Sequence, residues 1–331
     1  MNNEPSVSVL VAVYNAEKYL KQCLDSLLAQ TLRDIQIICV DDCSTDGSYQ
    51  LLKDYARQDS RIEAYQMAVN GGQAKARNEA IRHARGRFIA FLDSDDWMES
   101  DALERCLEVF RQHELTDCVL MRVLSVKEDG TETDYDKPIP MLLTGQEAFE
   151  ASLDWSIHGW YVARSELYKK WPYDDTCKSY SDDNITRQHY FHSREVRYAP
   201  AAKYFYRCYD LSVTRKPTVR RFDYLRATES MKRQLLELKV TERILSKYED
   251  ERWLVLVGCY MFYHVHGRQL SAEDRAFGLS ELNRCWQGID RRLLSKDLTR
   301  KFGYRPMPSW WLFRVQEWLY FSIRGLLGKN Y

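Results

Sequence analysis

Apolar runs and helical periodicities alternate through the first hundred residues. Residues 7–13 are almost entirely apolar and rich in β-branched side chains, which is typical of a central parallel strand covered on both faces. The next segment, 18–30, repeats its apolar side chains at helical spacing. Further strands are expected at 35–40, 62–66 and 87–92, and further helices at 49–58 and 74–84. This alternation predicts an α/β fold with a Rossmann-like doubly wound sheet.

Beyond residue 100 the pattern becomes irregular and then helical. It predicts a helix at 101–113, a strand at 118–126, a mobile polar excursion at 131–140, a helix at 181–192 and short strands at 196–199 and 203–206. Thr144 and Glu147 have capping-box spacing, so a helix is expected to start there and reach about residue 153. Further helices are expected at 222–245, 252–264, 272–286 and 310–327. The sheet is therefore expected to be followed by a C-terminal helical extension.

Composition favours a globular chain of a reducing compartment. The 331 residues include 48 Lys plus Arg and 48 Asp plus Glu, so no net charge points to nucleic acid as a partner. Nine cysteines without a CxxC pair fit reduced thiols better than a disulfide framework. The N-terminus has no basic segment followed by an apolar core, and the most apolar run, 253–263, is far shorter than the ~20 residues of a spanning helix. We therefore expect a cytoplasmic protein.

Polar side chains follow three of the expected strands. They are Tyr14-Asn15, Asp41-Asp42 and Asp93-Ser94-Asp95-Asp96. Ligands of doubly wound sheets bind outside the carboxyl ends of the strands, so these side chains predict one site. Carboxylates this close repel one another unless a cation compensates, and oxygen ligands suit Mg²⁺ or Mn²⁺. The alternative is a solvated turn in which Asp95 or Asp96 caps the next helix.

The order and spacing of these motifs resemble the family 2 inverting glycosyltransferases of the GT-A fold, which use nucleotide-sugar donors. The resemblance is carried by residues 7–20, 40–48, Asn70-Gly71-Gly72, Ala76-Arg77-Asn78 and 91–97. It implies a GT-A domain at 1–215, with a nucleotide-sugar-binding half at 1–100 and an acceptor-side half at 101–215. An α-helical region at 216–331 follows, and nothing in it is recognisable.

The resemblance also implies how the donor is held. Tyr14 would pack on the nucleotide base, Asp42 would contact the base, and Arg77 would lie near the diphosphate. The remaining residues of the expected nucleotide-sugar-binding set are Asn15, Gly71, Gly72, Asp93 and Ser94.

Asp93-Ser94-Asp95 corresponds to the DxD motif of the family, which engages the metal and the ribose. Mn²⁺ or Mg²⁺ is therefore the expected cofactor, with Asp95 and Asp93 as ligands and Asp96 as a further candidate. Which of the three touches the ion directly is left open.

The general base of the family is the last acid of a pair that opens a helix, and Asp182-Asp183 stands at that place. The resemblance implies Asp183 as the base. Asp182 stands where Glu is commoner in the family, so it remains the alternative. Acids in a first helical turn also have an ordinary explanation, because they complement the helix dipole, and the two roles are compatible.

These assignments predict a metal-dependent inverting glycosyltransferase. It would move a sugar from a nucleoside-diphosphate donor, with UDP as the expected nucleotide, to a glycan or lipid-linked saccharide in bacterial surface polysaccharide synthesis. One alternative is a non-catalytic nucleotide-sugar-binding or scaffold protein. The other is a sugar nucleotidyltransferase, which should carry a Gly-rich phosphate loop after the first strand, where this chain has residues 14–17.

Two aromatic features leave alternatives open. The helix expected at 310–327 has a broad apolar arc with flanking basic residues, which suits the interface of the plasma membrane's inner face. The same arc suits the protein's own core or a second subunit in a homo-oligomer. Trp155, Trp160 and Trp171 suit either stacking on sugar rings or core packing.

Overall fold

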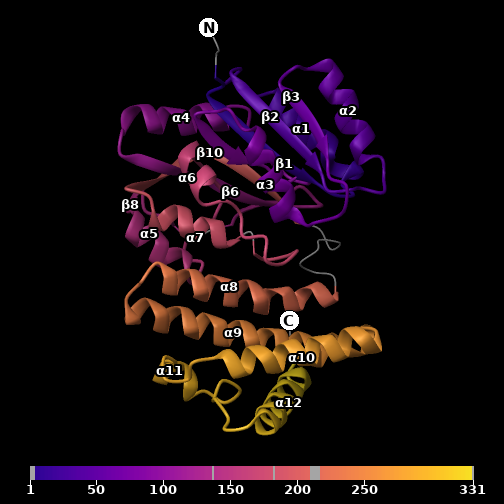
Figure 1. Ribbon diagram of the computed structural model, residues 1–331, viewed down its shortest axis with the longest axis vertical. Helices are drawn as coiled ribbons and strands as arrows, with labels where there is room; N and C mark the ends of the chain where they lie inside the picture. The colour runs from indigo at the N-terminus through magenta and orange to yellow at the C-terminus, as the bar shows by residue number, and fades with distance from the viewer. Residues whose placement is uncertain (1–3, 136–137, 182, 209–216, 330–331) are drawn as a thin grey trace. The chain divides into compact units, whose positions relative to one another are not determined.

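The computed structural model describes residues 4–135, 138–181, 183–208 and 217–329. The chain forms two compact units, the first made of Met1–Asp175 and Asp182–Asp210, the second of Thr176–Ser181 and Leu211–Tyr331 (Figure 1). The boundary expected after residue 215 falls outside the described residues. The first unit holds the sheet, and the second is helical.

The first half of the sheet has the expected doubly wound arrangement. Its strands are β1 (Val7–Val13), β2 (Ile35–Asp41), β3 (Ile62–Gln66) and β4 (Phe88–Phe91), parallel and in the order β3-β2-β1-β4. The intervening helices are α1 (Glu17–Leu28), α2 (Ser48–Gln58) and α3 (Gln73–His83). Val13 pairs with Asp41, and Leu10 pairs with Phe91, so the three polar strand ends lie at one edge. The prediction from the sequence pattern is confirmed here.

The second half makes the sheet mixed. Its strands are β5 (Trp97–Met98), β6 (Thr116–Lys127), β7 (Glu132–Asp134), β8 (Leu142–Thr144), β9 (Tyr161–Arg164) and β10 (Glu195–Cys208). Its helices are α4 (Ala102–Gln112), α5 (Gly145–Ser152), α6 (Ser165–Lys170) and α7 (Asp183–Phe191). The main path continues β4-β9-β6-β10-β5, with β9 antiparallel to both of its neighbours. The capping box of Thr144 and Glu147 is present.

Two expectations about this half were wrong. The short strands expected at 196–199 and 203–206 are one strand, β10, whose register with β6 shifts between Ala199 and Lys203. The polar excursion at 131–140 includes strand β7, which pairs with β6. In both places pairing with β6 decides the structure, and a local pattern carries no information about that partner.

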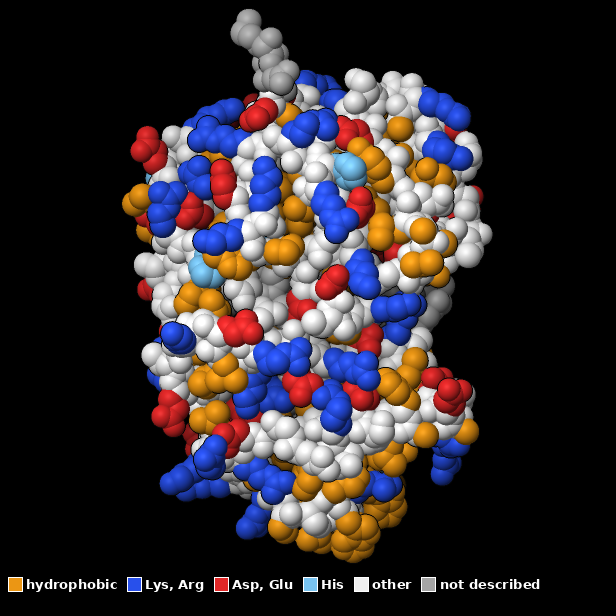
Figure 2. All heavy atoms as spheres, viewed as in Figure 1, with side chains coloured by type: hydrophobic (Ala, Val, Ile, Leu, Met, Phe, Trp, Pro, Cys, Tyr) orange, Lys and Arg blue, Asp and Glu red, His pale blue; other side chains and the backbone are white. Residues whose placement is uncertain are grey.

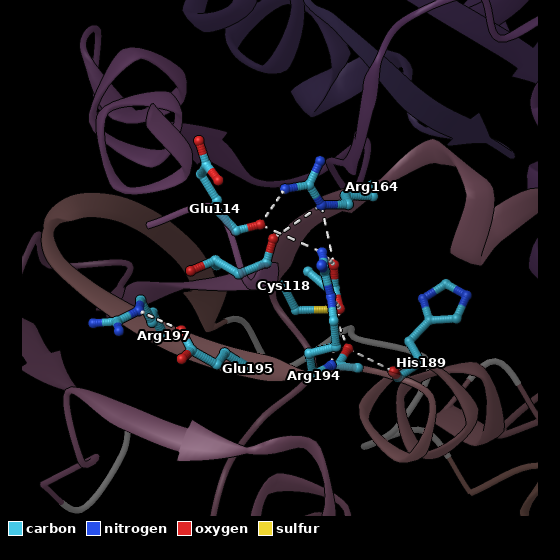
Figure 3. A network of polar contacts seen from close by, with 10 residues as sticks. Glu114, Cys118, Arg164, His189, Arg194, Glu195 and Arg197 are labelled. Atoms are coloured by element: carbon cyan, nitrogen blue, oxygen red, sulfur yellow. Dashed lines mark hydrogen bonds and ion pairs between the residues drawn. The ribbon is translucent and has the colours of Figure 1, made fainter. Parts of the chain in front are cut away.

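A charged cluster ties β6, β9 and the start of β10 together (Figure 3). The Asp117 carboxylate accepts hydrogen bonds from Arg164 Nε at 3.0 Å and from Arg194 Nε at 3.0 Å. Burial alone would raise the pKa of Asp117, but the hydrogen bonds from Arg194 and the charge of both arginines outweigh it, so the pKa is lowered. The Asp117 carboxylate therefore joins β6 to β9 and to Arg194, which lies between α7 and β10.

The helices of the second unit differ from the expected ones in two places, because the helix expected at 222–245 ends at Glu237 and the next helix runs from Glu242 to His266. They are η1 (Val219–Phe222), α8 (Asp223–Glu237), α9 (Glu242–His266), η2 (Gly267–Gln269), α10 (Ala272–Gly288), α11 (Lys296–Thr299) and α12 (Trp310–Leu326). The expected interruption between 245 and 252 is absent. Glu249 is buried there, where its carboxylate binds Arg252 at 2.8 Å and Lys232 at 2.7 Å. The polar stretch is therefore helix interior, not a loop.

Helix α12 packs on an aromatic core through Phe313 and Phe321, and the same face buries Glu317. The Glu317 carboxylate accepts one hydrogen bond, from Gln316 Nε2 at 3.0 Å. Within the described residues its second oxygen has no hydrogen-bond partner. Burial raises the pKa of Glu317 from 4.5 to about 8.

Replacing Glu317 by Gln should stabilise the protein most at high pH. The raised pKa means that the folded state keeps a proton which the unfolded state releases above pH 4.5, so stability is lost as pH rises towards 8. Gln is isosteric and neutral, so we expect little change at pH 5 and a gain on the order of 3 kcal/mol at pH 8.5. Thermal unfolding at the two pH values measures this, with the exposed Glu273→Gln as the matched control. An equal effect of Glu317→Gln at both pH values would contradict it.

Candidate functional site

Asp42 organises the glycine turn that precedes α3. Its buried carboxylate accepts hydrogen bonds from the Gly71 and Gly72 amides, both at 2.7 Å, and from Asn70 Nδ2 at 2.8 Å. Gly72 has a φ of +94°, which other residues resist. The turn is therefore held in one shape by three donors on one carboxylate, while the expected contact of Asp42 with a base stays a prediction.

Asn15 locks the ends of β1 and β2 together. It adopts a φ of +48°, its side-chain oxygen accepts from the Thr45 amide at 2.8 Å, and its own amide donates to Ser44 Oγ at 2.9 Å. The preceding Tyr14 is 41% exposed. Tyr14 therefore presents its aromatic ring to solvent at the end of β1, as stacking on a nucleotide base requires.

Asp93 is paired with a buried arginine from α3. The Arg77 guanidinium forms an ion pair with Asp93 and lies over the rings of Phe91, at 4.3 Å, and Tyr173, at 5.1 Å. Gln73 Nε2 donates to the same Asp93 oxygen at 2.8 Å. Asp93 is therefore paired with a cationic side chain of the protein itself.

Asp96 is buried and holds the acidic turn to β10 through hydrogen bonds. Its two oxygens accept from Tyr204 Oη and from the Arg207 amide, each at 2.8 Å, and its side chain is almost completely enclosed. Burial, followed by the charges of Asp93 and Asp95, raises the pKa of Asp96 well above its ordinary value. The alternative in which Asp95 or Asp96 caps the next helix is wrong, because the N-cap of α4 is Asp101.

Arg207 of β10 contacts the acidic turn after β4. The sequence pattern did not identify it as a site residue. Its Nε donates to the Asp95 carbonyl at 2.7 Å, and its guanidinium lies 4.7 Å from the ring centres of both Tyr19 and Trp97. The tyrosines at 204 and 206, on the same strand, were the available signal.

A chain of contacts leads from the acidic turn to helix α7. Tyr173, which stacks on Arg77, exchanges two hydrogen bonds with Asn78, both at 2.9 Å. The next residue, Asp174, accepts from Asn184 Nδ2 at 2.7 Å. Asn184 directly follows Asp183, the first residue of α7. These contacts connect the start of α7 with the helix that carries Arg77, and the place of Asp183 in the site stays a prediction; Asp182 lies outside the described residues.

The loop before β9 packs along α7. Tyr190 Oη donates to the His158 carbonyl at 2.6 Å, and a Cβ on Gly159 would lie 2.5 Å from Thr186 Oγ1. The Arg187 guanidinium lies 4.7 Å from the ring centre of Trp155. Helical spacing puts 183, 186, 187 and 190 on one side of α7, so this loop lies on the side that carries Asp183.

Trp155, Trp160 and Trp171 lie in different environments. Trp160 packs among Tyr135, Tyr204 and Tyr206, and Trp171 stacks on His192. Trp155 is 37% exposed and has a φ of +58°. Only Trp155 of the three therefore keeps the exposed ring that a sugar platform requires.

The carboxylates of the acidic turn after β4 suit a divalent cation whose other ligands come from a bound substrate. In the described part of the chain no three His, Cys, Asp or Glu side chains form a cluster able to hold a metal. Mg²⁺ and Mn²⁺ are commonly held by one or two carboxylates together with substrate phosphates. Asp95, which is half-buried, and Asp93 fit that set, whereas both oxygens of Asp96 are already hydrogen-bonded.

Fold and site define an α/β domain with a preorganised polar site at the carboxyl edge of its sheet. Residues 8–180 match the family model described as glycosyl transferase family 2, which is more than half of the chain. The chain belongs to this family and has the GT-A fold.

Two curated relatives show the extent of the likeness. EpsH of Bacillus subtilis (strain 168), assigned as a glycosyltransferase, is 33% identical over 224 residues, which cover 64% of this chain and 63% of EpsH. The poly(ribitol-phosphate) beta-glucosyltransferase of Bacillus spizizenii is 36% identical over 161 residues, 44% of this chain and 25% of that protein. The chain thus matches less than two thirds of the length of either relative.

Two solved structures share the fold. S. aureus TarS 1–349 in complex with UDP-GlcNAc has a TM-score of 0.70 and 19% identity, covering 98% of this chain and 92% of that one. The mannosyltransferase PcManGT from Pyrobaculum calidifontis, in complex with GDP-Man and Mn²⁺, has a TM-score of 0.54 and 15% identity, covering 98% and 88%. The identities are low, so the likeness concerns the fold.

Replacing Tyr204 by Phe should destabilise the first unit. The hydroxyl donates to buried Asp96 and accepts from the Asp93 amide, so its loss leaves buried polar groups unsatisfied. We expect the free energy of unfolding to fall by about 1–3 kcal/mol, measured by urea unfolding. Tyr206→Phe, on the same strand and half-buried, is the matched control and should cost less. Equal losses for the two variants would count against Asp96 as an anchor.

Proposed function

We propose that this protein is a metal-dependent inverting glycosyltransferase. It transfers a sugar from a nucleoside-diphosphate donor, a UDP-sugar, to a hydroxyl of a glycan or lipid-linked saccharide in bacterial surface polysaccharide synthesis. The observation that carries the proposal is the chain of contacts from Asp93 through Arg77 and Tyr173 to α7, because it connects the acidic turn with the helix that begins at Asp183. The UDP-GlcNAc complex of TarS supports the donor class, and the likeness to the poly(ribitol-phosphate) beta-glucosyltransferase of Bacillus spizizenii supports the acceptor class.

The strand edge holds the donor in this proposal. Tyr14 stacks on the base, and Asp42 with the Gly71-Gly72 turn and Asn15 shapes the pocket that receives the nucleotide. Arg77, Asp93 and Ser94 lie on the ribose and diphosphate side. Asp95 and Asp93 would hold Mn²⁺ or Mg²⁺, which when bound neutralises charge on the departing diphosphate.

Asp183 acts on the opposite side of the transferred sugar. The acceptor oxygen attacks the anomeric carbon, the bond to the β-phosphate breaks, and Asp183 takes the hydroxyl proton. A single displacement inverts the anomeric configuration. His158 and His189 are unsuited to this role, because burial lowers the pKa of each to about 3 and both are enclosed. The exposed ring of Trp155 supports the loop on α7 as the acceptor side.

We place the reaction in the cytoplasm. None of the nine cysteines forms a disulfide in the described residues, which suits a reducing compartment. Within the described residues no helix combines the length and apolarity needed to span a bilayer.

Removing divalent cations should abolish transfer. The leaving diphosphate gathers negative charge that the protein's own side chains at Asp93 and Asp95 cannot neutralise, so EDTA should reduce UDP-sugar turnover to background and Mn²⁺ or Mg²⁺ should restore it. Release of UDP in the presence and absence of a saccharide acceptor is the measurement. Turnover at full rate in EDTA would refute metal dependence.

Replacing Asp183 by Asn should remove the base while keeping the donor site. We expect transfer to fall by about 10²–10⁴-fold, with UDP affinity in the presence of Mn²⁺ close to that of the unchanged chain by calorimetry. Asp182→Asn is the matched variant and should retain most activity. If Asp182→Asn abolishes transfer and Asp183→Asn does not, Asp182 is the base.

A further inference from the structure

Hydrophobic side chains gather on the surface over α12 (Figure 2), and helical spacing puts the exposed ones opposite buried Phe313 and Phe321. The exposed fractions are 68% for Trp311, 56% for Trp318 and 89% for Leu326. Further exposed residues of the same surface are Leu312, Val315, Leu319, Ile323 and Leu327. Because Phe313 and Phe321 already fill the core on the other side, this surface, which we call the α12 face, is not the one that packs on the protein's own core.

Basic residues predominate in α12 and in the segment that leads into it. Residues 298–329 contain six basic residues and a single acid, Glu317, which is buried, although the whole chain carries equal numbers of both charges. The exposed basic residues are Arg300, Lys301, Arg305, Arg314 and Lys329. An exposed helix surface of aliphatic and tryptophan side chains, with basic residues on the same helix and before it, matches the apolar interior and anionic headgroups of a lipid leaflet.

We propose that the α12 face lies flat on an anionic lipid bilayer, with Trp311, Trp318 and Leu326 inserted among the acyl chains. A helix of 17 residues is about 25 Å long and rests in the interface without crossing the membrane. A second copy is a poorer occupant. A two-fold dimer would bring together two surfaces in whose segments basic residues predominate, and like charges oppose one another there. The proposal does not depend on the enzymatic function.

Vesicle cosedimentation of the full chain tests the proposal. At 0.1 M salt the chain should sediment with phosphatidylcholine vesicles that contain 30% phosphatidylglycerol, and several-fold less with pure phosphatidylcholine or at 0.5 M salt. The double variant Trp311→Ser, Trp318→Ser should lose at least tenfold in vesicle affinity. Leu236→Ser, which removes a similarly exposed apolar residue from α8, should bind as the unchanged chain does.

Three results would overturn the proposal. They are absence of binding to the anionic vesicles, equal binding by the double variant, and a dimer in light scattering that the double variant dissociates without vesicles. Circular dichroism and UDP binding of each variant establish that it is folded. Membrane binding without any sugar transfer would leave this proposal standing and reject the enzymatic one.

Discussion

The acidic turn after β4 is possible because one buried carboxylate is held from a distant strand. An apolar strand runs directly into three acids, and enclosing the last of them, Asp96, is costly unless donors meet it. Tyr204 and Arg207 supply these donors from β10, more than a hundred residues further on. The same contacts fix the turn relative to the far side of the sheet, so the position of Asp93 and Asp95 depends on them.

The acids of the site divide into those that hold the backbone and those that face the ligand edge. Asp42 and Asp96 have their oxygens taken by amides and a hydroxyl, and Asp93 is neutralised by Arg77. Charge is thereby compensated before any ligand arrives. A site built in this way needs little rearrangement when an anionic ligand binds, which is the condition for electrostatic preorganisation.

The sequence predicted what depends on local periodicity and missed what depends on distant partners. β1 to β4 and the capping box of Thr144 were predictable, because strand, helix and turn signals alternate clearly there. The role of Arg207 and the link from Asn78 to Tyr173 were not, since each joins segments far apart in the chain. The interruption expected within α9 failed for the same reason, because Glu249 is paired with Lys232 of α8.

Helix α12 reverses the usual distribution of polarity on a surface helix. Its carboxylate, Glu317, points into the unit at the expense of a raised pKa, while Trp311 and Trp318 point outward. In water alone both arrangements are unfavourable. The buried carboxylate loses its hydration, and the exposed indole rings keep apolar surface in contact with water. On an anionic lipid surface the outward tryptophans become favourable. An outward carboxylate at position 317 would be repelled by the headgroups. The inward acid and the outward tryptophans are therefore consistent with one environment.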